Sequence, residues 1–569
     1  MDRATLTPAL DEPVNIAWHL HVMARRQPHL MAVVVPQGRS VSGRMRYSHL
    51  TYRQLDCESD RIACGLAEWD IGPGTRAAVM VRPGLDFFAL VFGLFKAGVV
   101  PVMIDPGIGI KSLGNCLSEA EPEVFIGIPR ALVARRLLGW ARKSVRRVIA
   151  VAPPRRWPSR QTLDRLRRDG QRALEAGKAQ APVFRKVGPD AMAAILFTSG
   201  STGSPKGAVY THAIFQAQVE RFRTLYEIEP GEIDLCTFPL FALFAPALGM
   251  TAIVPDMDPT RPALVNPERI FEAIDDFGPT NLFGSPALLR RVGPAGMARG
   301  LKIPTLRRVV TAGAPAPSRV LAEFAGLLEP PAEIFTPYGA TEALPIASIG
   351  STEILEETRH QTDQGKGVCI GRAVEGVEVR IIRIDDGPIA VWSDDLELSD
   401  GMIGEIVVSG PMVTREYYNR PEATALSKIA DPARATFFHR MGDLGYRDHR
   451  GRLWFCGRKS HRVVLADTTL FTVCCEGVFN VHPAVARSAL VGVPGARGNT
   501  PVLCVEPSGR LSRVEQKRLR QELLDRGALF PQTRPITTIL FHPSFPVDIR
   551  HNSKIFREKL AVWAARNLH

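Results

Sequence analysis

Residues Leu196 to Gly207 read LFTSGSTGSPKG and have the composition of a phosphate-binding loop. An apolar run, 191–197, leads directly into small hydroxyl residues, glycines and one lysine, Lys206. Glycines let backbone N–H groups turn toward one anion, hydroxyls add donors, and the lysine adds a mobile positive charge. The loop is not a Walker A motif, because Lys206 lies between Pro205 and Gly207. We expect a nucleotide triphosphate to bind here; a flexible Ser/Gly surface turn is the alternative.

Three further motifs carry groups suited to a nucleotide. Thr311–Pro315 (TAGAP) follows a predicted strand and is by itself only a turn signal. Tyr338–Glu342 (YGATE) offers a ring that can stack on a base, a hydroxyl for a phosphate and a carboxylate for Mg²⁺. Met441–Gly445 (MGDLG) contains Asp443, whose two oxygens suit the vicinal diol of a ribose, and Arg458 lies fifteen residues later. An aromatic turn with a helix cap and a generic Gly-Asp turn are the structural alternatives for the last two motifs.

Together these motifs resemble the adenylate-forming superfamily of acyl-CoA synthetases, peptide-synthetase adenylation domains and luciferases. The string [Ser/Thr]-Ser-Gly-[Ser/Thr]-Thr-Gly-x-Pro-Lys-Gly is highly specific to its phosphate loop, and the resemblance covers nearly the whole chain. It implies ATP and Mg²⁺ as cofactors, with Glu342 as the metal ligand. It also implies an ATP/AMP site formed by Thr198, Ser199, Gly200, Ser201, Thr202, Gly203, Lys206, Gly313, Ala314, Pro315, Tyr338, Gly339, Ala340, Thr341, Asp443 and Arg458.

The resemblance also assigns catalysis. Lys554, within the string RHNSKI, occupies the position of the superfamily's catalytic lysine, although Ser553 stands where glycine usually precedes it. A carboxylate that attacks the α-phosphorus needs negative charge neutralised on both partners, and Lys554 with Mg²⁺ would do this. A solvent-facing lysine is the alternative. The implied catalytic set is completed by Thr198, Lys206 and Glu342.

Three strings resemble one branch of the superfamily, the β-lactone synthetases of bacterial long-chain olefin biosynthesis. They are Phe238–Phe244 (FPLFALF), Tyr338–Pro345 (YGATEALP) and His551–Ala561 (HNSKIFREKLA). This resemblance implies that a 2-alkyl-3-hydroxy fatty acid is adenylated and that its own 3-hydroxyl then closes the lactone and releases AMP. A tethered nucleophile can reach effective molarities on the order of 10⁵ M or more, so no second substrate site is required. Association with other olefin-pathway enzymes is implied as well.

Departures from the acyl-CoA ligase pattern also favour a β-lactone synthetase over transfer to CoA. Ala242 stands where those ligases usually carry histidine, Ser460 occupies the hinge position, and Asp467 would place a carboxylate on the path of pantetheine. A fatty acyl-CoA or acyl-AMP ligase and an inactive acyl-adenylate binding protein stay open as alternatives. The inactive protein is disfavoured by intact Lys206, Glu342, Asp443, Arg458 and Lys554.

By the same resemblance, the acyl pocket is expected along 238–250 and 281–289, because these segments follow strands that end near the nucleotide in the superfamily. Its candidate lining residues are Phe241, Ala242, Phe244 and Gly284. The sequence does not identify the base for lactone closure; three histidines near the hinge are candidates only by neighbourhood, namely His439, His449 and His461.

The segments that position these motifs alternate between strand and helix. Thr51–Glu68 reads as an amphipathic helix with Thr51 as its cap, and 76–311 repeats strand-then-helix units. This pattern predicts an α/β fold with doubly wound, largely parallel sheets. After Gly367, short β-runs separated by turns predict a small antiparallel β-barrel.

A hinge is expected at Cys456–Lys459. We therefore predict an adenylation domain, residues 1–457, that holds the ATP and acyl sites. A mobile α+β domain, residues 458–569, would carry the catalytic lysine, as the superfamily resemblance implies.

Bulk composition limits the remaining possibilities. The chain has 569 residues and a net charge of +13, with thirteen arginines between 130 and 172. This segment predicts a solvated helical face, or else docking on an acidic partner or an anionic membrane, so peripheral membrane contact stays open. No nucleic-acid partner is expected, because no recognised motif accompanies the charge. Nine cysteines without a Cys-x-x-Cys pair, no apolar leader and no membrane-length apolar run predict a cytoplasmic protein without a transmembrane segment.

Overall fold

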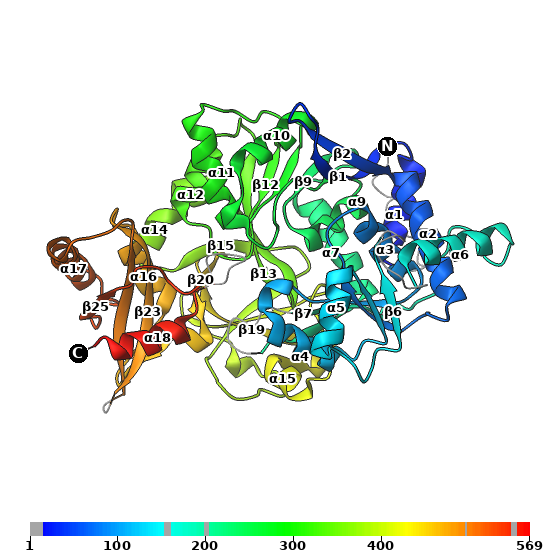
Figure 1. The fold of residues 1–569 in the computed structure, drawn as a ribbon. Helices are drawn as coiled ribbons and strands as arrows, with labels where there is room; N and C mark the ends of the chain where they lie inside the picture. Colours follow the sequence, from blue (N-terminus) through cyan, green and yellow to red (C-terminus); the bar gives the residue numbers. More distant parts are fainter. Residues whose placement is uncertain (1–14, 153–160, 198–203, 496–497, 548–554, 569) are drawn as a thin grey trace.

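The computed structural model describes residues 15–152, 161–197, 204–495, 498–547 and 555–568 (Figure 1). The chain enters through α1 (Trp18–Arg26), the hairpin β1 (Met31–Arg39) and β2 (Met45–Thr51), and α2 (Tyr52–Glu68). The Thr51 side chain accepts a hydrogen bond from the backbone N–H of Gln54, whose own side chain bonds back to Thr51. This reciprocal capping box satisfies two backbone donors and fixes the start of α2 where the sequence predicts it.

One sheet of six strands carries the phosphate-loop region. Its order is β6-β5-β3-β4-β7-β8, and all neighbours are parallel except β7 and β8. Its strands are β3 (Arg76–Met80), β4 (Val100–Met103), β5 (Val124–Gly127), β6 (Arg147–Ala150), β7 (Met192–Phe197) and β8 (Gly207–Thr211). Its accompanying helices are α3 (Leu85–Lys96), α4 (Ile110–Ala120), α5 (Pro129–Leu138) and α6 (Leu163–Glu175). The predicted phosphate loop therefore connects the antiparallel pair β7 and β8.

Helix α6 crosses α2 closely because both helices have glycine at the contact. A Cβ atom added to Gly170 would lie 1.9 Å from the carbonyl oxygen of Arg61, and one added to Gly65 would lie 2.1 Å from that of Leu166. At the same interface Arg167 pairs with Glu58 and Asp86. Part of the basic charge between residues 130 and 172 is thus neutralised within the fold.

The second sheet has fourteen strands and begins as a parallel α/β layer. Its parallel strands are β1, β10 (Thr251–Ile253), β9 (Ile233–Cys236), β11 (Asn281–Phe283), β12 (Arg308–Val310) and the start of β13 (Glu333–Ala340), and β2 pairs antiparallel with β1 at the edge. The helices between them are α7 (His212–Leu225), α8 (Pro239–Ala242), α9 (Phe244–Leu248), α10 (Pro267–Phe277), α11 (Pro286–Ala298) and α12 (Ser318–Ala325). Together with the six-stranded sheet, this layer confirms the predicted α/β class.

Beyond β13 the same sheet becomes antiparallel, as the short β-runs and turns after Gly367 predict. The strands are β14 (Ala343–Gly350), β15 (Val368–Ala373), β20 (Leu453–Arg458), β19 (Thr436–Arg447), β17 (Gly404–Ser409) and β16 (Glu378–Ile382), with β18 (Lys428–Asp431) paired to β19. They do not form a sheet of their own. Because β13 and β14 make an antiparallel hairpin and β14 pairs with β15, the hydrogen bonding continues from the parallel layer without a break.

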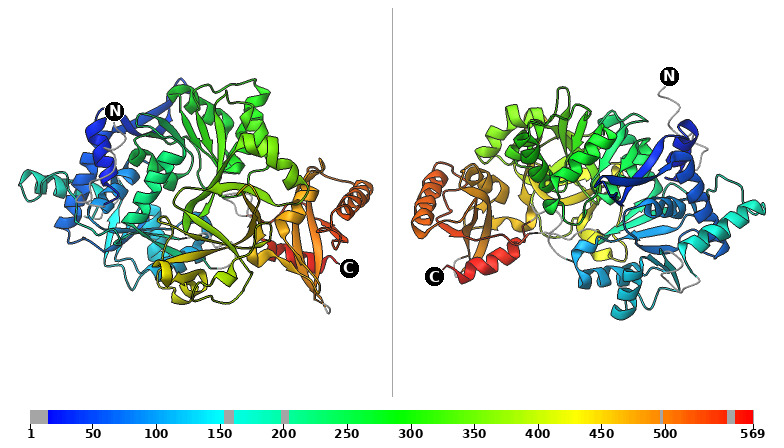
Figure 2. Two further views of the ribbon diagram at one scale, coloured as in Figure 1. Left: turned by 180° about the vertical axis from the view of Figure 1, so that it is seen from behind. Right: turned by 45° about the horizontal axis from the view of Figure 1, so that its top comes forward.

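The C-terminal unit is a small α+β layer built around β23 (Val485–Gly495), β24 (Gly498–Pro507) and β25 (Thr538–Phe541). It also contains the hairpin β21 (Val463–Val464) and β22 (Thr469–Leu470), and helices α16 (Thr472–Asn480), α17 (Arg513–Ala528) and α18 (Arg557–Arg566). Two buried apolar clusters draw their buried members only from residues 463–564. Figures 1 and 2 show this unit, orange to red, at one side of the larger body.

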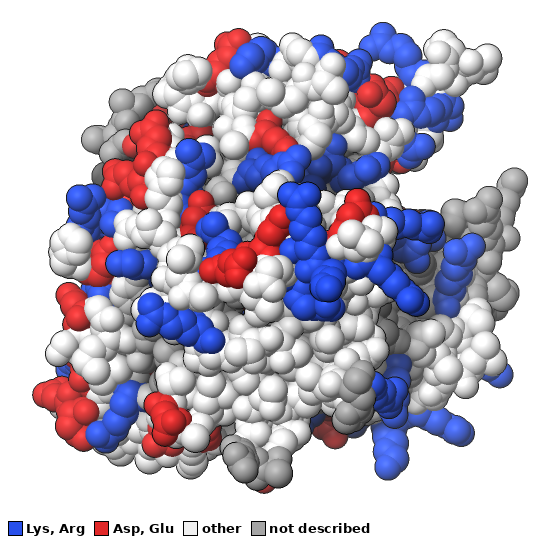
Figure 3. Space-filling model, turned by 90° about the vertical axis from the view of Figure 1, so that its left-hand side faces the viewer, with Lys and Arg blue, Asp and Glu red and all other residues white. Residues whose placement is uncertain are grey.

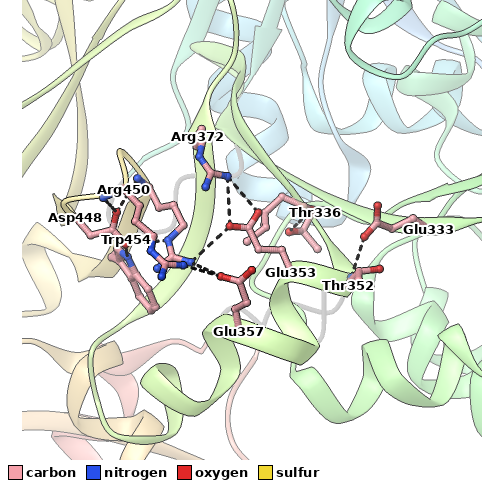
Figure 4. Close-up of polar contacts among 11 residues, drawn as sticks. Glu333, Thr336, Thr352, Glu353, Glu357, Arg372, Asp448, Arg450 and Trp454 are labelled. Carbon is pink, nitrogen blue, oxygen red and sulfur yellow. Dashed lines mark hydrogen bonds and ion pairs between the residues drawn. The ribbon is translucent and has the colours of Figure 1, made fainter.

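A network of ion pairs holds the antiparallel region against a helical segment, 351–363, that follows β14 (Figure 4). Its centre is Arg452, which is only 3% exposed. The Arg452 Nε atom donates to Asp448 at 2.8 Å, and its Nη1 atom lies 3.2 Å from a Glu357 oxygen and 3.6 Å from a Glu353 oxygen. Burial alone would raise the pKa of Asp448, but hydrogen bonds from Trp454 and Arg452 lower it to about 2.

We expect Arg452→Met to destabilise the protein by about 2–3 kcal/mol, because the partly buried Asp448 would lose its cation. Arg450→Met is the matched control, since Arg450 is exposed and its contact with Glu357 is worth at most about 1 kcal/mol. Urea unfolding of both variants near pH 7 measures the difference. Because the pKa of Asp448 is lowered, its contribution is complete above about pH 4 and is lost as the pH falls toward 2. Equal midpoints for the two variants would contradict the prediction.

Basic side chains are distributed unevenly over the surface. On the face in Figure 3, Lys and Arg gather in the upper half and around a hollow at the right-hand edge, while Asp and Glu are scattered. Among the helices in the described part of the chain, none combines the length and apolarity needed to cross a bilayer.

Candidate active site

A cavity of about 580 Å³ lies where the two sheets and the start of the C-terminal unit meet. One end of it is polar and is lined by residues that the sequence predicts for the nucleotide: Lys206, Gly313, Gly339, Ala340, Thr341, Glu342 and Arg458. They come from the connections before β8 and after β12, from the end of β13 and the hairpin turn that follows it, and from the end of β20, so residues distant in sequence share one wall. Thr198, Ser199, Gly200, Ser201, Thr202, Gly203 and Lys554 lie outside the described residues. Ala314 and Pro315 follow Gly313 but are not part of the wall.

Beside this wall, Asp443 forms an ion pair with Arg458 and accepts a hydrogen bond from Tyr338. Strand register places Asp443 opposite Arg458, and the Arg458 Nε atom lies 3.1 Å from Asp443 Oδ1. The Tyr338 hydroxyl donates to Asp443 Oδ2 at 2.7 Å, so the Tyr338 ring is held by this bond. The Asp443 carboxylate raises the pKa of Arg458, while burial and then Asp443 raise the pKa of Tyr338 well above its usual value. Two partners therefore orient the Asp443 carboxylate, as a group that accepts ribose hydroxyls must be.

We expect Tyr338→Phe to raise the Kd for ATP about tenfold, because the Asp443 carboxylate loses a hydrogen bond that fixes its orientation. Tyr446→Phe is the control: Tyr446 lies on β19, as Asp443 does, but its hydroxyl donates to the backbone oxygen of Lys366, away from the cavity. Calorimetric titration with ATP distinguishes the two variants. An unchanged Kd in Tyr338→Phe would show that Asp443 needs no support from this tyrosine.

Glu342 lies at the hairpin between β13 and β14, with Lys206, Tyr417 and Lys428 around it. The Tyr417 hydroxyl donates to Glu342 Oε1 at 2.7 Å, and Lys206 Nζ lies 5.0 Å from the centre of the Tyr417 ring. Burial lowers the pKa of Lys428 to about 7, although the Glu342 charge opposes that shift. This corner therefore contains one oriented carboxylate and two lysines, a combination suited to a metal-bound polyphosphate.

The donor set fits Mg²⁺. Glu342 presents hard oxygen ligands to the cavity, and Mg²⁺ in nucleotide sites binds one or two carboxylates together with phosphate oxygens and water. Within the described ranges, no three His, Cys, Asp or Glu side chains gather closely enough to hold a metal by themselves. Glu342 would hold the ion jointly with the phosphates, and the bound ion would neutralise phosphate charge.

Of the three hinge-region histidines, His439 lines the cavity. Its Nδ1 atom lies 3.1 Å from the carbonyl oxygen of Ser427, which requires a proton on Nδ1 and leaves Nε2 unprotonated in the neutral ring. Burial, followed by the charge of Lys428, lowers the pKa of His439 far below its usual value. His449 is exposed, and burial lowers the pKa of His461 to about 3. His439 is therefore the one of the three that faces ligands, as a neutral hydrogen-bond acceptor.

The other end of the cavity is apolar and includes two of the predicted acyl-pocket residues, Phe241 and Phe244. Ala242 is buried behind this wall, and Gly284 lies between the wall residues Phe283 and Ser285. Asp467 is exposed in the turn between β21 and β22. The turn carries the Asp467 carboxylate out to solvent, and its expected position on the path of pantetheine stays a prediction.

Comparison with known proteins agrees with this geometry. Residues 20–418 match the family model described as "AMP-binding enzyme". An olefin β-lactone synthetase from Xanthomonas campestris pv. campestris is 49% identical over 97% of this chain and 98% of its own length. A second olefin β-lactone synthetase, from Stenotrophomonas maltophilia, is 48% identical over 98% of this chain and 99% of its own.

The chain belongs to the AMP-binding enzyme family and, within it, to the olefin β-lactone synthetases. It is an ATP-dependent, adenylate-forming ligase. The fold agrees: the structure of ATP-bound MatB from Rhodopseudomonas palustris superposes with a TM-score of 0.76 at 20% identity, covering 98% of this chain and 100% of that one.

Proposed function

We propose that this enzyme converts a 2-alkyl-3-hydroxy long-chain fatty acid into its β-lactone with consumption of ATP. In the first step a carboxylate oxygen attacks the α-phosphorus of ATP, forming the acyl-adenylate and releasing pyrophosphate. In the second step the 3-hydroxyl oxygen attacks the acyl carbon, the bond to AMP breaks, the hydroxyl proton is lost and the four-membered ring closes. AMP then leaves together with the lactone.

The observation that carries the proposal is one continuous cavity with a polar and an apolar end. Lys206, Glu342 and Arg458 line the polar end, whereas phenylalanines line the apolar one. A long-chain acid can therefore lie with its carboxylate at the nucleotide and its hydrocarbon in the apolar part. Because the second nucleophile belongs to the same molecule, the site needs no further substrate.

Each polar group has a role in the first step. Asp443 and Arg458 hold the ribose, Lys206 neutralises phosphate charge, and Glu342 takes part in holding Mg²⁺. We assign Lys554 to the α-phosphate at the moment of attack, as the family resemblance implies. The apolar part of the cavity limits access of water, which protects the adenylate from hydrolysis before the ring closes.

The test is product analysis with MgATP and a 2-alkyl-3-hydroxyalkanoate, with and without CoA. We expect β-lactone, AMP and pyrophosphate in equal amounts, unaffected by CoA. The matched 2-alkylalkanoate without the 3-hydroxyl should be adenylated once and give no lactone. A CoA thioester as the main product would establish an acyl-CoA ligase instead, and no pyrophosphate from any acid would indicate a binding protein.

The cellular setting forms part of the same proposal. We place the enzyme in the cytoplasm, in association with the enzymes that supply the hydroxy acid and consume the lactone. Co-purification from cells that produce the lactone would support this association. Recovery of the enzyme alone under the same conditions would contradict it.

A further inference from the structure

A second, smaller apolar cavity of about 70 Å³ adjoins the large one. The two cavities share six wall residues: Phe241, Phe244, Phe283, Ala312, Pro337 and Leu344. From this shared wall they extend in different directions. The large cavity continues to Phe92, Met103 and Ala194, whereas the small one continues to Ile228, Leu248 and Met250.

Helix α7 lines both cavities with one stripe of side chains. Phe215 and Val219 lie on the large cavity, and Phe222 and Tyr226, further along the same stripe, lie on the small one. The spacing of these residues is that of one helix face. The two cavities therefore lie one after the other along α7.

Aromatic rings separate the two spaces. Phe241 stacks on Phe283 with ring centres 4.4 Å apart. The Phe244 ring lies 6.2 Å from Phe215 on the large-cavity side and 5.4 Å from Phe222 on the small-cavity side. This arrangement makes a divider whose two faces are both apolar.

The polar residues that line the small cavity are already paired with neighbours. Arg308 donates to Glu232 and, at 2.7 Å, to Asn281 Oδ1. Asp234 accepts a hydrogen bond from the Cys236 thiol at 2.9 Å, and its burial raises its pKa to about 6. With these groups satisfied among themselves, the space that remains suits hydrocarbon.

We propose that the two cavities are separate subsites for the two hydrocarbon chains of one branched acid, with Phe241, Phe244 and Phe283 between the chains. The inference rests on the proposed function, in which the chains leave adjacent carbons, C2 and C3. The shared wall residue Ala312 precedes Gly313 at the nucleotide end, so the branch point lies beside the reacting carboxylate. A linear acid would need only one of the two cavities. Since their volumes are unequal, the two chains should tolerate different lengths.

Two matched variants test the assignment. Val219→Phe fills the large cavity and Ile228→Phe the small one; both replace a buried β-branched residue that lines only one cavity. Val219→Ala and Ile228→Ala enlarge the same two cavities. They keep the assignment testable if either phenylalanine variant fails to fold. The substrates are two series of 2-alkyl-3-hydroxyalkanoates, each lengthened in one chain only, and the readout is kcat/KM for pyrophosphate release.

We expect Val219→Phe to reduce kcat/KM about tenfold or more for long members of one series and to leave the other series within about twofold. Ile228→Phe should affect the other series, and the alanine variants should shift each preference toward longer chains. Variants that all act on the same chain, or that leave both preferences unchanged, would overturn the inference. Pyrophosphate release does not depend on ring closure, so selective adenylation without lactone would refute the proposed function and keep the two subsites.

Discussion

Lys554→Ala is expected to bind ATP with a Kd within about threefold of wild type and to lose adenylation by about 10²–10³-fold in kcat. The reason is electrostatic: the lysine acts where negative charge develops during attack on the α-phosphorus, and loss of one such donor typically costs this much. Ground-state affinity depends instead on groups that the cavity already contains, including Asp443, Arg458 and Lys206. Calorimetry with ATP and pyrophosphate release with the hydroxy acid measure the two quantities separately.

Lys559→Ala is the matched control. Lys559 lies in the first turn of α18 and is exposed, and its Nζ atom lies 4.5 Å from the centre of the Phe556 ring. Lys559→Ala removes one positive charge, as Lys554→Ala does, but at a residue that does not line the cavity. The Kd for ATP and the rate of pyrophosphate release should therefore stay near wild type. Equal rates of pyrophosphate release in Lys554→Ala and wild type would count decisively against a catalytic role for Lys554.

The parts of the site that sequence could predict are those carried by short, local patterns. Asp443 and Arg458 could be named in advance because each lies in a short motif at a recognisable spacing, and the register of the β19–β20 hairpin then places them opposite each other. The α2 cap at Thr51 could be predicted because its partner lies three residues away. In each case one element or one turn contains the whole arrangement.

Tyr417, Lys428 and the aromatic divider could not be found in this way. Tyr417 bonds to Glu342 although the two residues are seventy-five positions apart in the sequence. No local sequence pattern predicts that Lys428 is buried. The stack of Phe241 on Phe283 joins helix α8, which follows β9, to the last residue of β11. Such contacts depend on the order of strands in the sheet, which single-sequence periodicity does not provide.

The predicted β-barrel also shows which strand pairings local sequence patterns can and cannot predict. Short strands and turns after Gly367 correctly indicated antiparallel pairing, because turn chemistry and alternation are local. The continuation into the parallel layer depends on the β14–β15 pairing, where Ala347 faces Ala373 across a connection that contains helix. Nothing in the local pattern distinguishes this pairing from a separate closed sheet.

Glu342→Gln should lower kcat for adenylation by about 10²-fold and move the Mg²⁺ dependence to higher concentration. Glutamine keeps an acceptor for the Tyr417 hydroxyl, so the local fold is preserved while the negative charge is removed. The loss has two parts. A neutral ligand binds Mg²⁺ weakly, and without the Glu342 charge the pKa of Lys428, which burial already holds near 7, falls further and reduces the positive charge in this corner.

Glu375→Gln is the control, because Glu375 is 86% exposed and pairs with Arg221 at the surface. Pyrophosphate release titrated with Mg²⁺ at fixed ATP distinguishes the two variants. A Glu342→Gln enzyme with a lower kcat at saturating Mg²⁺ and an unchanged Mg²⁺ midpoint would assign the carboxylate to the charge balance with Lys428. A shifted midpoint assigns it to the metal, and an unchanged kcat together with an unchanged midpoint would remove Glu342 from the mechanism.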